Sequence, residues 1–173
     1  MRATRAFTVI ELLVVVAIFG LLLTLAVPSF NDLILSTRIK GAASDIYASF
    51  ALARSEALKR NANVTVGPVP AGASWTGGWQ VAVGASVLNT HGPAANLRIE
   101  CPNGSDCNQT LTYSGNGRLV SGVPAGQPTA LLNVDVLSPP TSRRVPMRCV
   151  QIDLSGRVSV LVDNNRDGDC TNG

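Results

Sequence analysis

The sequence contains few of the residues on which enzyme sites and nucleic-acid surfaces usually depend. Only one histidine, His91, occurs in 173 residues, which leaves little room for a histidine metal cluster or relay. Charged residues make up 14% of the chain, against ~25% in a typical soluble domain, and the formal net charge is only +3. No Gly-x-Ser-x-Gly or Gly-x-x-x-x-Gly-Lys motif occurs, and the sequence around His91 predicts a loop. We therefore expect neither an enzyme nor a bound cofactor.

Hydrophobic residues reach 46% of the chain, and they concentrate near its start. Residues 7–27 contain only four members that are not apolar, and as a helix they would rise roughly 31 Å, about one hydrocarbon core. Arg2 and Arg5 precede this stretch without any acid, which predicts a single span with a cytoplasmic N-terminus. A cleaved signal peptide, cut near Ala26, and a plain signal anchor are the two alternatives.

Glu11 fits neither alternative well, because it places a carboxylate inside the apolar stretch. Such a group costs roughly 3 kcal/mol at the centre of a bilayer unless it is paired or near the interface. A free α-amino group could pair with it, which suggests a cut just before Phe7.

The residues around this expected cut resemble a known processing site. Residues 6–14, Ala-Phe-Thr-Val-Ile-Glu-Leu-Leu-Val, are similar to the start of type IV pilins and type II secretion pseudopilins. The resemblance implies that a prepilin peptidase cuts between Ala6 and Phe7 and methylates the new amine, although the family usually has Gly in place of Ala6. It also implies that Glu11, fifth in the mature chain, pairs with a neighbouring subunit's amino terminus. Pro28 falls where the family helix is kinked.

The pattern from Ser29 to about Asn61 is amphipathic, with apolar residues recurring every three or four positions. Ser29 is a candidate cap for a helix that restarts after Pro28. The expected buried stripe consists of Ile39, Ala42, Ile46, Phe50, Ala53 and Ala57. Residues 52–61 and 75–81 resemble the GspH/FimT family of minor pilins and pseudopilins.

The remainder predicts short strands separated by Gly, Pro and Asn clusters. The candidates are 63–66, 79–83, 97–101, 110–114, 118–121, 131–137, 149–153 and 157–162. We expect an α+β, pilin-like fold in which one long helix packs on an antiparallel sheet. The expected parts are a leader at 1–6, a membrane or filament-core helix at 7–28, an amphipathic helix half at 29–62 and a periplasmic β domain at 63–173.

Four cysteines follow the predicted span, on the side of the membrane where disulfides persist. We favour the pairs Cys101–Cys107 and Cys149–Cys170 among the three connectivities, because close neighbours avoid threading the sheet. A zinc site is the rival interpretation, but gaps of five and twenty residues differ from the usual spacing within a ligand pair.

The tail offers a candidate metal site. Asp163, Asn165 and Asp167 match the opening of a calcium loop, but Arg166 adds a charge of the wrong sign. The position of the closing Glu would be 174. The alternative, which we favour, is an Asx-rich turn before Cys170 without a metal.

Four arginines form a candidate DNA-binding surface. Arg143, Arg144 and Arg148 lie in a stretch without acids, and a hairpin could bring Arg157 close to Arg148. FimT-type minor pilins bind DNA through a C-terminal Gly-Arg-x-Arg motif. Gly156-Arg157 keeps its first half, while Ser159 replaces the second Arg. The alternative is a solvated basic edge that prevents sheets from pairing.

Together these features predict a minor pilin or pseudopilin that primes or joins the tip of a filament. Its expected partners are other pilins, the prepilin peptidase and the bacterial inner membrane. Two alternatives remain open, namely a subunit of a type II secretion pseudopilus and a DNA-binding minor pilin acting in DNA uptake.

Overall fold

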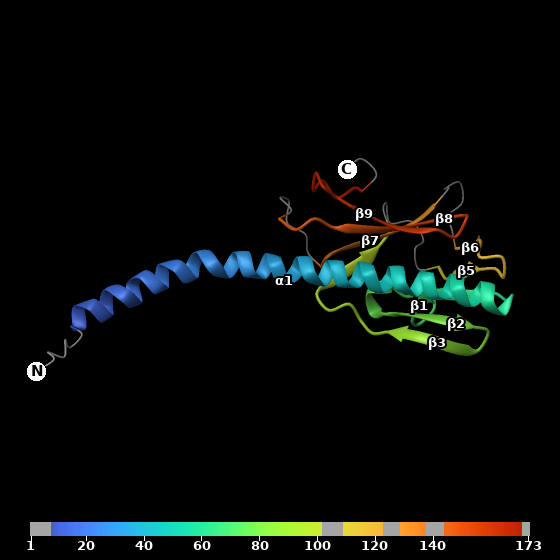
Figure 1. Cartoon of the computed structure of the whole chain (residues 1–173), viewed down its shortest axis with the longest axis horizontal. Coiled ribbons are helices and arrows are strands. Elements are labelled where there is room, and N and C mark those ends of the chain that lie inside the picture. Colours follow the sequence, from blue (N-terminus) through green and yellow to red (C-terminus); the bar gives the residue numbers. More distant parts are fainter. Residues whose placement is uncertain (1–7, 102–108, 123–128, 138–143, 171–173) are drawn as a thin grey trace, which may run out of the picture. The chain divides into compact units, whose positions relative to one another are not determined.

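The computed structural model describes residues 8–101, 109–122, 129–137 and 144–170. The chain divides into two units, Met1–Leu35 and Ser36–Gly173, and one helix, α1 (Val9–Arg60), runs through both (Figure 1). The helix is continuous through Pro28, so the predicted restart at Ser29 is wrong. Pro28 lacks the N–H that would bond to the carbonyl of Thr24, and α1 tolerates that loss.

In the first unit, α1 exposes nearly every apolar side chain that the structure describes there. Exposed fractions range from 45% at Val15 to 77% at Val9. This is the one described helix long and apolar enough to cross a membrane, and it lies near the N-terminus, as a signal sequence also would.

In the second unit, the predicted helix stripe is buried with one change. Ile39, Ala43, Ile46, Phe50, Ala53 and Ala57 are each at most 1% exposed. Ala43 takes the place predicted for Ala42, which is only half-buried. Asn61, with φ +49°, ends the helix, and the N–H of Ala62 donates to the carbonyl of Ala57 at 3.3 Å. This is a Schellman motif with Asn in the left-handed position.

The strands form two antiparallel sheets, where the sequence predicted one. The five-stranded sheet has the order β3-β2-β1-β5-β6, and the four-stranded sheet has the order β4-β7-β8-β9. Their bounds are β1 Val64–Pro68, β2 Trp79–Val83, β3 Ser86–His91, β4 Leu97–Glu100, β5 Leu111–Tyr113, β6 Leu119–Ser121, β7 Thr129–Val136, β8 Arg148–Asp153 and β9 Val158–Val162. A short 3-10 helix, η1 (Trp75–Gly77), precedes β2.

Strand β3 was not predicted, and His91 is its last residue rather than part of a loop. The two residues between β2 and β3, Gly84 and Ala85, form the turn, with Gly84 at φ +56°. A positive φ at a two-residue turn suits the twist of a hairpin. The register shifts after Val81, which leaves Leu88 as an extra residue in the edge strand.

The core of the second unit lies between α1 and the inner faces of the sheets. Phe50 of α1 is its centre, with Trp75 stacked at 5.9 Å and Tyr113 edge-on at 6.4 Å between ring centroids. Alternating residues of β1 and β8, Val64 and Val66 on one sheet and Val150 and Ile152 on the other, are fully buried. Aromatic pairs of this geometry contribute about 1 kcal/mol each beyond the area that they bury.

Candidate functional site

Thr8 and Glu11 cap the start of α1 reciprocally. The backbone N–H and the hydroxyl of Thr8 donate to Oε2 of Glu11 at 2.9 and 3.0 Å. The N–H of Glu11 donates in return to Oγ1 of Thr8 at 3.3 Å. This is a capping box, with Thr at the N-cap and Glu three residues later. Thr8 was not among the residues predicted to have a role, although Thr-x-x-Glu before an apolar run is the signature of this motif.

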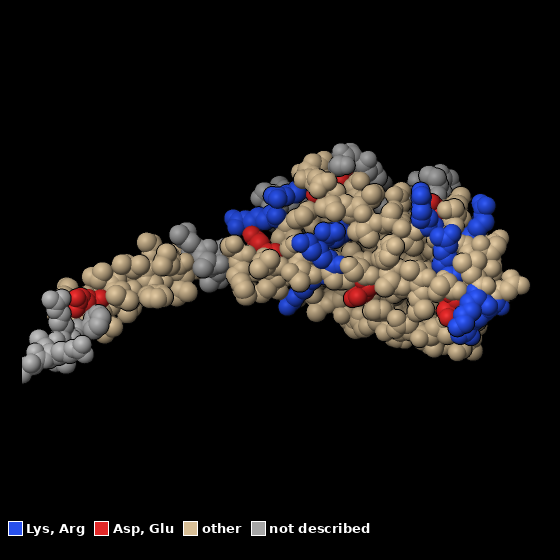
Figure 2. Space-filling view, in the orientation of Figure 1, with Lys and Arg blue, Asp and Glu red and all other residues tan. Residues whose placement is uncertain are grey.

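Beyond this cap, the helix presents an uncharged surface. No charged residue occurs between Glu11 and Asp32, and Figure 2 shows no Lys or Arg over this stretch. Phe19, Leu21, Phe30 and Leu33 are all more than 60% exposed. Surface of this kind needs lipid or other helices to cover it. The predicted cut lies outside the described residues, because Ala6 and Phe7 precede them.

The predicted arginine cluster does not form as expected. Arg148 pairs with Val162, at the end of the β8–β9 hairpin farthest from Arg157. Arg157 lies opposite Asp153, which is five residues along β8 from Arg148. The two arginines are therefore about 17 Å apart along the hairpin, well beyond the ~8 Å over which charges act in physiological salt. Side chains alternate along a strand, so Arg148 shares the face of Val150 while Arg157 shares the opposite face with Asp153. Arg143 lies outside the described residues, and Arg144 is exposed.

The turn of this hairpin has a structural role instead. Nη2 of Arg54 donates to the carbonyl of Ser155 at 3.1 Å, and the hydroxyl of Tyr113 donates to the carbonyl of Gly156 at 3.2 Å. Burial, reinforced by Asp153 and opposed by Arg54, raises the pKa of the Tyr113 phenol, which therefore stays protonated as a donor.

Gly156 has φ +80°, and a Cβ there would press on the carbonyl of Gly117 and lie 2.8 Å from the Tyr113 ring. Packing alone therefore explains why glycine precedes Arg157 in the half-kept Gly-Arg-x-Arg motif.

Arg157 itself is exposed and paired. Its Nε lies 3.5 Å from Oδ2 of Asp153, with the arginine side chain 80% exposed. The other carboxylate oxygen, Oδ1, accepts the hydroxyl of Ser155 at 2.5 Å and the N–H of Arg157 at 3.0 Å. The hydroxyl of Ser155, followed by the N–H of Arg157, holds the pKa of Asp153 below its usual range.

Asp163 organises the tail in the manner of the Asx-rich turn. It is fully buried, and its two carboxylate oxygens accept the N–H groups of Asp167 at 3.2 Å and Gly168 at 2.9 Å. Asn165 Nδ2 donates to Asp167 at 2.9 Å. Within the described residues, no three His, Cys, Asp or Glu side chains are grouped for a metal ion. The three predicted calcium ligands are thus engaged with one another and with backbone amides.

The disulfide Cys149–Cys170 is confirmed, with a Cα–Cα distance of 6.2 Å. It attaches the tail to the outer face of the β4-β7-β8-β9 sheet, where both sulfurs pack with Met147 and Leu161. Cys101 is also disulfide-bonded. Its predicted partner, Cys107, lies outside the described residues, so that pairing stays a prediction.

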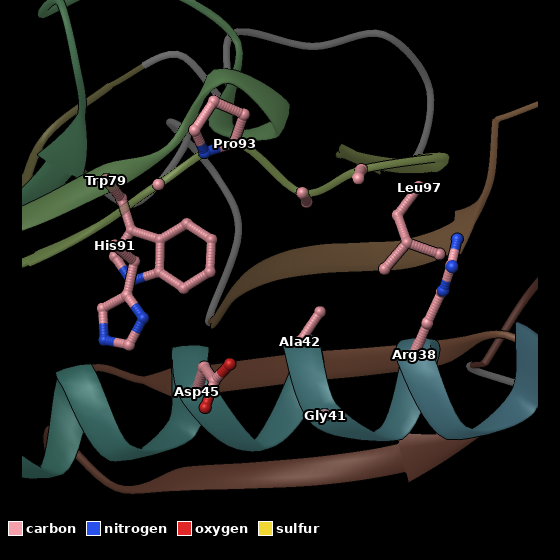
Figure 3. Close-up of a pocket in the computed structure, with 11 residues that line it drawn as sticks. Arg38, Gly41, Ala42, Asp45, Trp79, His91, Pro93 and Leu97 are labelled. Atoms are coloured by element: carbon pink, nitrogen blue, oxygen red, sulfur yellow. The ribbon is translucent and has the colours of Figure 1, made fainter. Parts of the chain in front are cut away.

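A cavity of about 500 Å³ lies beside α1 in the second unit, with α1 on one side and the chain from β2 to β4 on the other (Figure 3). Arg38 and Asp45 of α1 line it, together with Trp79, His91, Pro93 and Leu97. The His91 ring stacks on Trp79 at 4.8 Å and 10°. The indole N–H of Trp79 donates to Oγ of Ser49 at 2.9 Å, which fixes this wall to the helix.

Comparisons with known proteins agree with this geometry. Residues 42–156 match the family described as type II transport protein GspH, and residues 1–27 match the prokaryotic N-terminal methylation motif. Two proteins from Pseudomonas aeruginosa named fimbrial protein are each 39% identical over 59 residues, which is 34% of this chain and 38% of theirs. The match thus spans little more than a third of those relatives.

The fold is similar to that of the type IV minor pilin FimU of Pseudomonas aeruginosa. Its crystal structure in one form has a TM-score of 0.57 at 19% identity, covering 72% of this chain and 88% of FimU. A second crystal form gives 0.55 at 20% identity, with coverage of 70% and 90%. This likeness concerns the fold alone. Because the GspH profile covers most of the chain and the methylation motif covers its start, the chain belongs to the GspH family of minor type IV pilins and pseudopilins.

Proposed function

We propose that this chain is a minor pilin that primes or joins the tip of a type IV pilus. In this proposal residues 7–28 store the subunit in the inner membrane, with the β domain on the periplasmic side. Assembly exchanges lipid contacts of the helix for contacts with neighbouring helices. The observation that carries the proposal is the first part of α1. It exposes an apolar surface without charges between Glu11 and Asp32, and the Glu11 carboxylate at its start is held in a cap.

The capping box supports the further proposal that Glu11 meets the amine of a neighbouring subunit. Thr8 occupies only Oε2, and Oε1 has no hydrogen bond within the described residues. A cut between Ala6 and Phe7 would leave one residue before the N-cap, so Thr8 could still donate its N–H. One oxygen then keeps the cap while the other accepts an incoming ammonium group.

The first experiment measures sheared surface pili in a strain that lacks the gene. We expect pili to be lost and to return with the wild-type gene. Glu11→Gln is the informative variant, because glutamine can keep the capping box but carries no charge. If the charge is needed, Glu11→Gln fails to restore pili just as Glu11→Ala does. Full restoration by Glu11→Gln would contradict pairing with an amine.

Processing is tested by mass spectrometry of the chain recovered from membranes. We expect a chain that begins at methylated Phe7. A start at Met1, or at Val27 after a signal-peptide cut, would contradict prepilin processing.

Secretion is the second candidate function, favoured by the family description as a transport protein. The same deletion strain decides between the two roles. Normal pili together with loss of protein secretion would assign the chain to a type II secretion pseudopilus.

DNA binding is the third candidate, and a group of cations at the end of α1 supports it better than the arginines named from the sequence. Contacts bring the end of α1 together with the turns after β5 and β8, because Gly117 packs against Leu58 and Gly156 against Gly117. The cations at this end are Arg54, Lys59, Arg60, Arg118 and Arg157, and Figure 2 shows Lys and Arg gathered here. Glu56 lies among them, 2.6 Å from Arg60 and 3.5 Å from Lys59.

A titration of the chain with duplex DNA at several salt concentrations tests this candidate. Neutralising about three phosphates would give a slope of log K against log salt near −3. Binding should weaken in Arg118→Ala and Arg157→Ala but not in Arg148→Ala, which lies at the far end of its hairpin. No binding at low salt would exclude this role.

A further inference from the structure

The cavity beside α1 carries two opposite charges that no other described residue neutralises. Arg38 and Asp45 are both exposed, and neither makes an ion pair within the described residues. They are seven residues apart on one helix, so two turns, roughly 10.5 Å, separate them along the axis. That separation is too long for them to neutralise each other. Figure 3 shows Arg38 at the Leu97 end and Asp45 at the end with the His91–Trp79 stack.

Small residues keep the space between the two charges open. Gly41 and Ala42 form the floor, and a Cβ built at Gly41 would meet nothing within 4 Å. Gly92, on the opposite wall, is equally open. A volume of about 500 Å³ is within the range of roughly 300–1,000 Å³ that ligand pockets have, so the space is large enough to admit side chains of a partner.

The wall opposite the helix is built to hold its shape. Ser49 fixes Trp79, and Trp79 supports the His91 ring. Gly78, at φ +112°, lets the start of β2 lie close to the carbonyl of His91. A Cβ at this position would be only 2.5 Å from that carbonyl oxygen, so no side chain fits. The loop after β3 is tied back by the N–H of Ala94, which donates to Thr76 at 2.9 Å. Such a pre-ordered site loses little conformational entropy when a partner binds.

We infer that this cavity is a docking site for a neighbouring pilin of a different sequence, which inserts an acidic side chain at Arg38 and a basic one at Asp45. The inference rests on the proposed function, since it takes the partner from the same filament. A helix lying parallel to α1 supplies both groups when an acid is followed seven residues later by a base. Complementary charges of this kind chiefly set the register and the choice of partner.

A second copy of this chain does not supply that pattern in the described helix. The four acids of α1 are Glu11, Asp32, Asp45 and Glu56. The residues seven positions after them are Ile18, Ile39, Leu52 and Asn63, and none is basic. The pattern therefore points to another subunit, and pairing between identical copies becomes an outcome that would overturn the inference.

The test uses the full-length chain in its own piliated strain, with a photo-crosslinking amino acid at exposed Ala95 of the cavity wall. The matched control carries the same group at Ser86, which is exposed at the start of β3 and does not line the cavity. We expect Ala95 alone to give an adduct with another pilin, whose cross-linked peptide contains the acid and the base. Arg38→Glu and Asp45→Lys should each reduce the adduct by about tenfold, because each removes an attraction and adds a repulsion. Lys40→Glu, an exposed charge change outside the cavity, should not.

Three results would overturn the inference. The first is an adduct whose yield is unchanged in Arg38→Glu and Asp45→Lys. The second is an adduct with a second copy of this chain. In that case the adduct would be lost in Arg38→Asp or Asp45→Arg alone and would return when both changes are combined. The third is a chain that enters sheared filaments normally but gives no adduct at Ala95. A chain absent from filaments would instead contradict the proposed function, so the two failures are distinguishable.

Discussion

Replacing Gly156, which is buried, by alanine should destabilise the domain far more than an alanine substitution in a hairpin turn usually does. The new Cβ would press on the carbonyl of Gly117 and on the Tyr113 ring, and it would sit at φ +80°. A left-handed alanine costs about 1 kcal/mol. Forced repacking against backbone costs about 2 kcal/mol more, and the hydrogen bond from Tyr113 contributes about 1 kcal/mol. The expected loss is therefore about 4 kcal/mol of unfolding free energy.

Gly72 provides a matched control, because its φ is +81° and a Cβ there would meet nothing within 4 Å. Gly72→Ala therefore measures the backbone strain alone, about 1 kcal/mol. Urea unfolding of Ser36–Gly173, the unit that holds every buried core residue among those described, should separate the two variants. With an m-value of about 2 kcal/mol/M, Gly156→Ala should shift the midpoint by about 1.5 M more than Gly72→Ala. Equal shifts would show that the contact with Gly117 does not constrain the hairpin.

Three further predictions concern other contacts. Thr8→Val removes the capping hydroxyl and should lower pilus assembly while leaving the charge of Glu11 in place; wild-type levels of sheared pili would contradict this. Ser49→Ala leaves the buried indole N–H of Trp79 without its acceptor and should cost about 2 kcal/mol in urea unfolding, whereas Ser49→Thr should recover most of it. The lowered pKa of Asp153 means that its stabilisation is present above its usual pKa and is lost as the pH falls through the lower, folded value. Asp153→Asn should therefore narrow the difference in urea midpoint between pH 7 and pH 3, and an unchanged difference would count against that contribution.

The elements that depend on local pattern were predictable from the sequence. The helix stripe follows from the 3.6-residue period, and only the choice between Ala42 and Ala43 was wrong, because both lie close to the buried face. Strand β2 was predicted with its observed bounds. The pairing of Cys149 with Cys170 followed from the expected avoidance of threading.

Other features depend on which strands meet, which a single sequence does not specify. A strand such as Val64–Pro68 has the same pattern in one sheet or in two, so the division into two sheets was not visible. Strand β3 was not predicted because Ser, Asn and Thr interrupt the alternation of apolar and polar residues that marks a strand. The cavity lined by Arg38 and His91 joins residues more than fifty positions apart, and no local signal connects them.

Two errors were avoidable. The predicted strands 149–153 and 157–162 leave a short turn between them, and once Asp153 faces Arg157 the register places Arg148 opposite Val162 by counting alone. The proposed proximity of Arg148 and Arg157 was therefore already excluded by the predicted turn. Thr8, three residues before Glu11, was likewise a recognisable cap.

The cap changes how the role of Glu11 should be understood. A carboxylate near the start of a membrane-embedded helix would be costly if both oxygens lacked donors. Thr8 satisfies one oxygen within the subunit, at the helix end where the macrodipole also favours negative charge. In the proposed function, storage in the bilayer would then need no partner, and the second oxygen would be the one offered to a neighbour's amine. In this account Thr8 and Glu11 act as a unit. The threonine stabilises the subunit before assembly, and the glutamate forms a stabilising contact when the subunit enters the filament.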